Sequence, residues 1–249
     1  MPVSIVDPVL AAVRLTVWLN SACWAGPDTV GTSPDVAART IVAGDAAHHV
    51  VDRSGLLGLD PLYANELSAA LSAAAAFEQA GWVLAIPRPG HLGPLRGPAE
   101  TNQQVIAAGA GVLARTAGVA LVPEVVGGAV QWTTLSASNP ATSTTVSEGE
   151  RAVAEAVLSA TAELSALDVA GGDRPTAHTV RLPKPYEPRR QRALDRGLGL
   201  YTACTVALTD EGSAISSFET QRRRQVLTPL VGHAADLVCA VCSTPPTVR

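Results

Sequence analysis

The loop from Arg88 to Pro98 has the composition of an anion-binding site. It follows an apolar run typical of a buried strand. It precedes a predicted helix, whose first turn has unpaired backbone N–H groups and a positive dipole end. Arg88, His91 and Arg96 can add charge-assisted hydrogen bonds, and Gly97 lets the backbone approach a ligand closely. These four residues are the candidate binding residues for a small anionic ligand.

The same loop has an alternative interpretation as a rigid surface connection. Its three prolines lack the N–H group that an anion would need. Glu100 places a carboxylate near the helix N-terminus, where it competes with a bound anion. No Gly-Lys-Ser/Thr follows, so the loop is not a P-loop. In this alternative, Leu92 and Leu95 pack into the core.

A second group, Asp45-x-x-His48-His49-x-x-Asp52, combines ligands suitable for zinc or another divalent ion. On a helix the four residues would share one face. On a strand the two histidines would point to opposite faces, and no common site would form. Alternatively, Asp45 caps a turn and the histidines form local hydrogen bonds. Asp45, His48, His49 and Asp52 are candidate ligands, although no metal or other cofactor is expected.

A third group, Cys239-Ala-Val-Cys242, has the spacing of a redox or metal-binding pair. A redox cysteine is favoured at a helix N-terminus, where the dipole stabilises the thiolate, but this pair lies near the C-terminal end of a predicted helix. A zinc site would need two more ligands, and Cys23 and Cys204 have no pairing motif. We expect all four cysteines to be reduced and structural.

Two clusters of basic residues, within residues 181–196 and at Arg222–Arg224, could contact phosphates or an acidic partner. Only Tyr186 is interleaved with them, so base stacking is not supported. The formal net charge is −4, and neither half of the chain has the basic balance of a nucleic-acid-binding domain. We expect these arginines to lie on solvated helix faces, and we do not expect a nucleic-acid partner.

Standard catalytic motifs are absent from the sequence. It contains no G-x-S-x-G, no H-E-x-x-H, no G-x-G-x-x-G after a strand and no G-x-x-x-x-G-K. Catalytic triads assemble from distant positions, so an enzyme stays possible and the catalytic residues are unknown.

The composition fits a folded intracellular protein. The chain has 249 residues, of which 47% are hydrophobic and 16% charged, so it can bury a core and is not disordered throughout. Its N-terminus lacks the basic region of a signal peptide, and its longest uncharged run is interrupted by glycine, proline and hydroxyl residues. We expect a cytoplasmic protein without a membrane-spanning helix.

Apolar periodicity and capping residues predict seven helices. Their ranges are about 7–24, 33–44, 60–81, 98–108, 147–167, 189–208 and 216–243. Asp7, Ser33 and Asp60 are expected N-caps, because each is followed by proline. Capping boxes are predicted at Ser147-x-x-Glu150 and Ser216-x-x-Glu219. Pro229 is expected to kink or divide the last helix.

Strands are predicted at Trp82–Pro87, Val119–Val126 and Ala129–Ser136, with Gly127-Gly128 as a hairpin turn. Pro123 indicates an edge position or a bulge. The fold class is α+β: a small, mainly antiparallel sheet of residues 82–137, covered by helices from the N- and C-terminal parts of the chain. We expect a single domain over residues 1–249. The alternative is an α+β part over 1–146 followed by a helical part over 147–249.

The segment GWVLAIPRPGHLGPLRGPAETNQQVIAAG, with AGDAAHHVVD upstream and the Ser216 capping box downstream, resembles actinobacterial hypothetical proteins of similar length. The resemblance spans most of the chain and implies neither an activity nor a catalytic residue. The residues themselves favour a non-catalytic binding or protein-interaction module with an unknown protein partner. The alternative is an enzyme or a small-anion-binding protein that uses loop 88–98.

Overall fold

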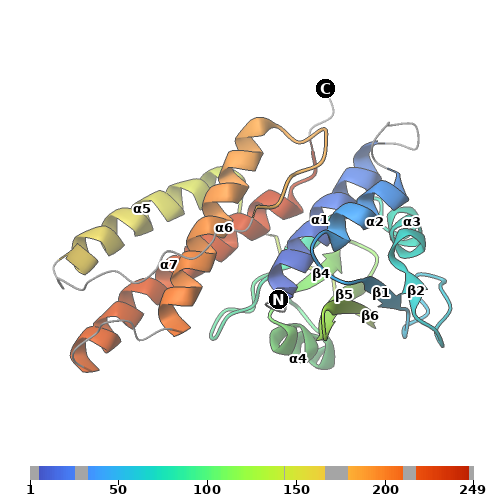
Figure 1. Cartoon of the computed structure of the whole chain (residues 1–249), viewed down its shortest axis with the longest axis horizontal. Coiled ribbons are helices and arrows are strands. Elements are labelled where there is room, and N and C mark those ends of the chain that lie inside the picture. The colour runs from blue at the N-terminus through green and yellow to red at the C-terminus, as the bar shows by residue number, and fades with distance from the viewer. Residues whose placement is uncertain (1–5, 26–32, 143, 166–178, 210–216, 247–249) are drawn as a thin grey trace. The chain divides into compact units, whose positions relative to one another are not determined.

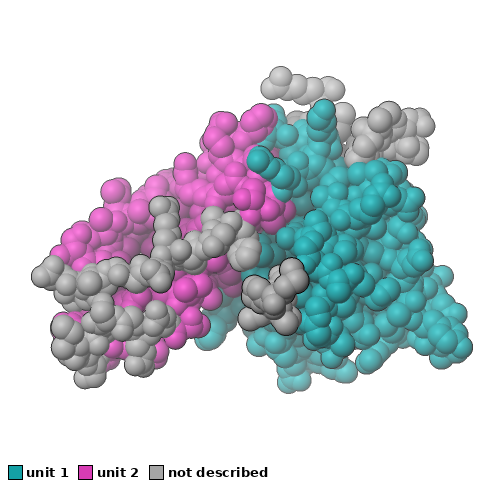
Figure 2. Space-filling model, viewed as in Figure 1, with its two compact units in different colours: residues 1–143, 181–187, 242–249 teal, residues 144–180, 188–241 magenta. Residues whose placement is uncertain are grey.

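The computed structural model describes residues 6–25, 33–142, 144–165, 179–209 and 217–246. The chain divides into two compact units (Figure 2). Unit 1 consists of residues 1–143, 181–187 and 242–249, and unit 2 consists of residues 144–180 and 188–241. Both units are therefore discontinuous in sequence. Whether they unfold together, as the single-domain expectation requires, stays a prediction.

The described residues of unit 1 contain a six-stranded sheet with the order β2-β1-β6-β5-β4-β3. Its strands are β1 (His48–Val51), β2 (Asn65–Glu66), β3 (Trp82–Ala85), β4 (Gly111–Ala114), β5 (Val119–Val126) and β6 (Ala129–Ser136). Neighbouring strands are antiparallel, except that β1 runs parallel to β6. With helices on both faces, this sheet confirms the predicted α+β class.

The sheet is larger than predicted, because it includes strands outside residues 82–137. The bounds predicted for β5 and β6 are correct, and Gly127 makes the turn between them with φ of 62°. The prediction missed β4, whose four residues are all buried and show no alternation. It left β1 open between a strand and a helical turn, and it missed the two-residue β2 entirely.

Four helices, α1 (Pro8–Ala25), α2 (Pro34–Val42), α3 (Leu67–Phe77) and α4 (Ala99–Ala108), cover the sheet. Two of the predicted caps are correct. The Asp7 carboxylate accepts a hydrogen bond from the Val9 N–H at 2.8 Å, and the Ser33 hydroxyl accepts one from the Val36 N–H. Figure 1 shows α1, α2 and α3 on one face of the sheet and α4 on the other.

The predicted start of the third helix is wrong. The side chain of Asp60 bonds the Leu62 N–H in a local turn, and Tyr63 is 70% exposed rather than part of a buried stripe. The Asn65 amide donates to the carbonyl oxygens of Val50, Asp60 and Tyr63. These bonds tie the segment to β1, so α3 begins only at Leu67.

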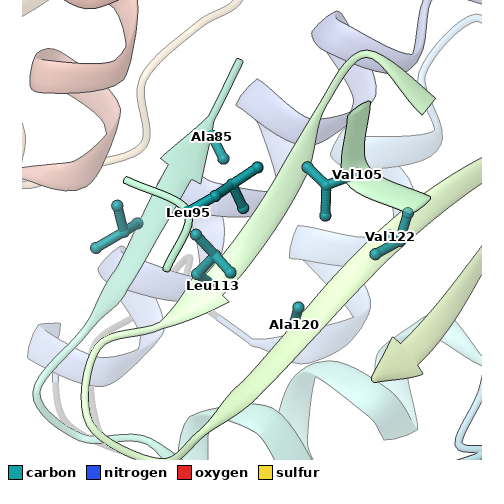
Figure 3. Close-up of a cluster of buried hydrophobic side chains, with 7 residues drawn as sticks. Ala85, Leu95, Val105, Leu113, Ala120 and Val122 are labelled. Atoms are coloured by element: carbon teal, nitrogen blue, oxygen red, sulfur yellow. The ribbon is translucent and has the colours of Figure 1, made fainter. Parts of the chain in front are cut away.

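The core between the sheet and α4 consists of small aliphatic side chains (Figure 3). The strands contribute Val83, Ala85, Leu113, Ala120 and Val122, α4 contributes Val105, and loop 88–98 contributes Leu95. All seven are buried. Close packing of small side chains here fits a chain with only 4% aromatic residues.

The outer edge of β3 is closed by side chains rather than by another strand. The Asn20 amide of α1 donates to the Trp82 carbonyl at 2.9 Å, and its oxygen accepts from the Trp82 N–H at 2.7 Å. The Ser243 hydroxyl accepts from the Leu84 N–H at 2.9 Å. Asn20 also donates to the Cys242 carbonyl at 2.8 Å. Residues near both ends of the described chain therefore complete unit 1.

Unit 2 contains three described helices, α5 (Val146–Ser165), α6 (Pro188–Thr209) and α7, which spans Ser217–Ser243 and ends in unit 1. A Cβ atom on Gly149 would lie 3.2 Å from the Leu237 Cα, so the start of α5 closely approaches the end of α7. Glu163, near the end of α5, pairs with Arg222 near the start of α7. These two contacts show that α5 and α7 are antiparallel.

Three predictions fall within these helices. The capping box of α5 is Thr145-x-x-Glu148, not Ser147-x-x-Glu150, because the Glu148 carboxylate bonds both the N–H and the hydroxyl of Thr145. These bonds hold the pKa of Glu148 below its ordinary value. Ser216 lies outside the described residues. Pro229 does not divide α7, which is continuous.

One helix in the described part of the chain, Phe218–Ser243 within α7, has the length and apolar composition of a membrane span. From the sequence we expect no membrane-spanning helix. However, 67% of its most apolar window is buried inside the protein, as in a core helix. Length and composition alone therefore do not make α7 a membrane helix.

Candidate functional site

Loop 88–98 is closed on itself by short-range hydrogen bonds. The backbone groups of Arg88 and His91 bond each other in both directions at 2.9 Å, around Pro89 and Gly90. Gly90 has φ of 76°, as the third position of a Pro-Gly turn requires. The Arg88 guanidinium lies 3.1 Å from the His91 Nδ1, so this ring nitrogen accepts the hydrogen bond.

The second half of the loop is held in the same way. The Arg96 Nη1 donates to the carbonyls of Leu95 at 2.7 Å and Gly93 at 3.2 Å. The Gly97 N–H donates to the Asn102 side chain at 3.1 Å. Of the two leucines expected in the core, Leu95 is 2% exposed and buried. Leu92 is 45% exposed, because the Arg88–His91 turn holds it at the surface.

These contacts occupy part of the proposed anion site. One guanidinium nitrogen of Arg96 bonds the loop's own carbonyls, and the Gly97 N–H already has an acceptor. Glu100 is exposed in the first turn of α4, where its negative charge opposes a bound anion. The four candidate residues thus lie near one another, and their observed contacts stabilise the loop.

The candidate metal ligands do not converge. His48 and His49 lie on strand β1, so they point to opposite faces: His48 is buried and His49 is exposed. The two histidines do not lie on a helix, so the shared face that helical spacing would have given them does not form. Among the described residues, no group of three or more His, Cys, Asp or Glu side chains is arranged to hold a metal ion.

Asp45, His48 and Trp132 form a buried hydrogen-bonded chain instead. The Trp132 indole N–H donates to the His48 Nδ1 at 3.3 Å, and the His48 Nε2 donates to Asp45 at 2.9 Å. Arg14 lies 3.5 Å from the same carboxylate. Desolvation lowers the pKa of His48, while the hydrogen bond to Asp45 opposes this shift. His48 is therefore held neutral, with its proton on Nε2.

Asp52 has a separate structural role. Its carboxylate is fully buried and accepts hydrogen bonds from the Thr134 hydroxyl at 2.6 Å and from the N–H groups of Leu57 and Leu59. Ser54 bonds both Asp52 and Thr134. These bonds shape the loop that follows β1.

The four cysteines are thiols in the structure, and none forms a disulfide. Burial raises the pKa of Cys23 to about 11 and also raises the pKa of Cys204. A raised pKa disfavours the reactive thiolate, so a structural role for these two residues remains our prediction.

Members of both basic clusters pair with α5. Arg189 bonds Glu150 at 2.9 Å, and Arg222 bonds Glu163 at 2.7 Å. These pairs lie on exposed helix faces, where each contributes about 0–1 kcal/mol. Arginines that are committed to carboxylates in this way have less capacity to contact phosphates.

A pocket of about 420 Å³ lies in unit 1, between the end of α4 and strand β5. We call it the edge pocket. Its lining residues are Pro8, Gln104, Ala107, Ala108, Val122, Pro123, Glu124, Val125 and Thr133. Most of these side chains are apolar. The polar ones are the amide of Gln104, the carboxylate of Glu124 and the hydroxyl of Thr133.

The edge pocket lies where β5 extends beyond its neighbour. β4 pairs with β5 only at Ala120 and Leu121, whereas β6 pairs with β5 along its whole length. From Val122 onward, β5 has a strand on one side only. Pro123 thus occupies a local edge, where its missing N–H costs no ladder bond on the open side. The sequence predicted this edge position, although β5 is a central strand elsewhere.

The polar side chains of the edge pocket have no partner in the part of the chain that the structure describes. Within the described residues, Gln104, Glu124 and Thr133 make no side-chain hydrogen bond or ion pair. Thr133 is 7% exposed as a residue, but its hydroxyl is not among the buried side-chain atoms that lack a partner, so it can reach solvent or a ligand in the pocket. A ligand could supply these missing bonds.

A row of polar residues continues from the pocket across the sheet. Cross-strand partners place Glu124 opposite Gln131, Gln131 beside His49 and His49 opposite Glu66. Partners in register share one sheet face, which is the face that Val122 and α4 occupy. Glu124, His49 and Glu66 are exposed. This row contains two carboxylates and no arginine or lysine.

This site was not predicted from the sequence, because its residues come from four elements, α1, α4, β5 and β6. Glu124 follows Pro123 in a strand, and that pair is the one local signal that could have drawn attention to it. The contribution of α4 depends on where β4 ends, and β4 itself was not predicted.

A six-stranded sheet with helices on both faces, together with a helical second unit, defines an α+β protein. Two family models match adjoining parts of the chain. The model described as "Rv1486c-like protein, N-terminal domain" matches residues 12–148, and that described as "Rv1486c-like protein, C-terminal domain" matches residues 147–236. The chain therefore belongs to the Rv1486c-like protein family. No curated protein and no solved structure matches it.

Proposed function

We propose that this protein is a non-catalytic binding protein that holds a small ligand in the edge pocket. The supporting observation is that one pocket combines apolar walls with three polar side chains that lack partners among the described residues. Its volume of about 420 Å³ suits a small ligand, since such pockets span roughly 300–1,000 Å³. We further propose a cytoplasmic location. An actinobacterial source would fit a chain with a single lysine, Lys184.

The absence of catalysis is proposed from the pocket's chemistry. Glu124 is the only titratable side chain among the lining residues. A catalytic nucleophile is commonly activated by an adjacent base, and the lining residues contain no such pair. Gln104 and Thr133 can orient a ligand by hydrogen bonds, but neither titrates near neutral pH.

A small anion at loop 88–98 is the second candidate. Arg88, Arg96 and the N-terminus of α4 favour it, since guanidinium groups and a helix N-terminus both attract negative charge. The anion would have to share Arg96 with the carbonyls of Gly93 and Leu95. We therefore rank this site below the edge pocket.

The test is a thermal-shift screen with three proteins: the wild type, Ala107→Phe and Ile106→Phe. Ala107 is exposed and lines the pocket, so a phenyl ring there fills the pocket without entering the core. Ile106 is its exposed neighbour on α4 outside the lining and serves as the matched control. Compounds that stabilise the wild type should stabilise Ile106→Phe equally and Ala107→Phe much less.

Two outcomes would contradict the edge pocket. Compounds that stabilise all three proteins equally would place the ligand elsewhere. Phosphate- or carboxylate-bearing compounds that lose their effect only in Arg88→Ala/Arg96→Ala would instead support loop 88–98.

A further inference from the structure

We propose that the ligand of the edge pocket carries an ammonium group on an apolar hydrocarbon body. This inference rests on the proposed function and adds the class of ligand. It follows from the donors and acceptors that line the pocket and from the charges on the adjoining sheet face.

The side chains that line the pocket include several acceptors and no cationic donor; their donors are the Gln104 amide and the Thr133 hydroxyl. An ionised carboxylate such as that of Glu124 only accepts hydrogen bonds, and Pro8 and Pro123 have no backbone N–H. No lysine, arginine or histidine is among the lining residues. An ammonium group has three donors and no acceptor, so it complements this wall. An anionic ligand would find no cation and would be repelled by Glu124.

The walls suit a hydrocarbon body. Aliphatic surface comes from Ala107, Ala108, Val122 and Val125, and Val125 is 40% exposed. Covering such surface is favourable because it removes apolar area from water. Thr133 and Gln104 can accept the remaining donors of an ammonium group through their oxygens.

Glu124, the one member of the polar row that lines the pocket, sets the orientation of the ligand. Glu124 belongs both to the pocket lining and to the row Glu124–Gln131–His49–Glu66. We place the ammonium group at Glu124, where the pocket meets the row, and the hydrocarbon body against α4. Glu66 lies three strands away, or about 14 Å at 4.7–4.9 Å per strand. This distance exceeds the Debye length of about 8 Å at physiological ionic strength, so Glu66 should contribute little.

The experiment measures binding of hexylamine, hexanol and hexanoate by titration calorimetry. The proteins are the wild type, Glu124→Gln, Glu66→Gln, Glu100→Gln and Ala107→Phe. Hexylamine should bind the wild type at least tenfold more tightly than hexanol or hexanoate does.

Glu124→Gln should weaken the binding of hexylamine about tenfold or more, because it removes a charge-assisted bond. Glu66→Gln should change binding less than about threefold. Glu100→Gln, an exposed carboxylate on α4 outside the pocket, should leave binding unchanged.

Failure of this inference is distinct from failure of the proposed function. If hexanol binds as well as hexylamine, or if Glu124→Gln has no effect, the amine class is wrong. The binding function still stands if Ala107→Phe abolishes the measured binding. If Ala107→Phe leaves binding unchanged, the pocket itself is wrong. Equal losses in Glu124→Gln and Glu100→Gln would show unspecific attraction to an acidic surface and overturn the inference. Tetra-lysine serves as a further probe, and its binding without binding of hexylamine would overturn the inference in favour of a basic peptide.

Discussion

The outer edge of β3 and the local edge of β5, both in the sheet of unit 1, differ in how their backbone groups are satisfied. At the outer edge of β3, Asn20 and Ser243 bond the backbone of Trp82 and Leu84. At the local edge of β5, beyond Leu121, no strand or described side chain replaces β4, and the edge pocket lies there instead. Both edges belong to the same sheet, yet one is sealed and the other is open.

The difference follows from the burial of the two backbones. All four residues of β3 are buried, so each backbone N–H and C=O must find a partner or lose its hydration without compensation. β5 becomes exposed from Glu124 onward, so water can bond its backbone. Pro123 removes one donor at the point where burial ends. An open edge is thus tolerated where solvent or a ligand can reach it.

Removing Cys242 and Ser243, which bond Asn20 and the β3 backbone, should destabilise unit 1 more than any other change proposed here. A fragment of residues 1–146 lacks Cys242 and Ser243, so Leu84 and Asn20 lose their partners. We expect limited proteolysis between Ser136 and Ser147 to yield an N-terminal piece without a cooperative unfolding transition. Two fragments that each unfold cooperatively, at the denaturant concentration of the intact chain, would show instead that the chain has two independent domains.

Asn20→Ala should destabilise the protein by about 3–5 kcal/mol, since each buried group left unsatisfied costs about 1–3 kcal/mol. The substitution removes three hydrogen bonds from a fully buried residue. Urea denaturation measures the loss. Ser21→Ala is the control, because its buried hydroxyl makes a single bond to the Lys184 carbonyl and should cost about 1 kcal/mol. Equal losses for the two variants would show that the seal on β3 has no special role.

Acidification tests whether the buried His48 of β1, rather than its exposed neighbour His49, makes stability depend on pH. Burial lowers the pKa of His48, so the native state binds fewer protons than the unfolded state. The free energy of unfolding should be highest above the unfolded histidine pKa of about 6.5. It should fall as the pH drops below that value. Urea midpoints at pH 7.5 and 5.5 measure the loss. His48→Gln, which keeps a donor for Asp45, should reduce this pH dependence, whereas exposed His49→Gln should preserve it. The same slope in both variants would contradict this assignment.

Pro123→Val should have the smallest effect. The substitution restores an N–H at the open edge and keeps a buried apolar side chain of similar volume. Losing the restricted proline should cost about 0.4–1 kcal/mol through the entropy of the unfolded chain. Urea denaturation beside Asn20→Ala checks the contrast. A loss as large as that of Asn20→Ala would mean that the open edge also depends on its exact backbone chemistry.

Local signals explain which elements could be predicted. Asp7 and Ser33 cap their helices, and Gly127-Gly128 turns between two long strands, because each of these interactions spans only a few residues. Asp60-Pro61 predicted a helix start as Ser33-Pro34 did. The bond from Asn65 to β1 instead holds this segment in a turn, and α3 begins at Leu67. Short strands such as β4 have too few residues to show a period.

The candidate sites were also predictable only where their residues lie close together in the sequence. The proximity of Arg88, His91 and Arg96 was predictable, because they share one short loop. The internal bonds that occupy them were not, since they depend on the loop's final shape. The edge pocket joins Gln104, Glu124 and Thr133 across the chain, and no spacing in the sequence relates them.

The position of Ser243 also affects the order in which unit 1 is completed during synthesis. The Leu84 N–H bonds the hydroxyl of Ser243. The ribosome makes Ser243 roughly 100 residues after residue 143, which ends the first segment of unit 1. At the usual translation rate of about 5–20 residues per second, this delay is about 5–20 seconds. During that interval the nascent chain has an unsealed β-strand, which is the kind of surface that chaperones bind and that aggregation exploits.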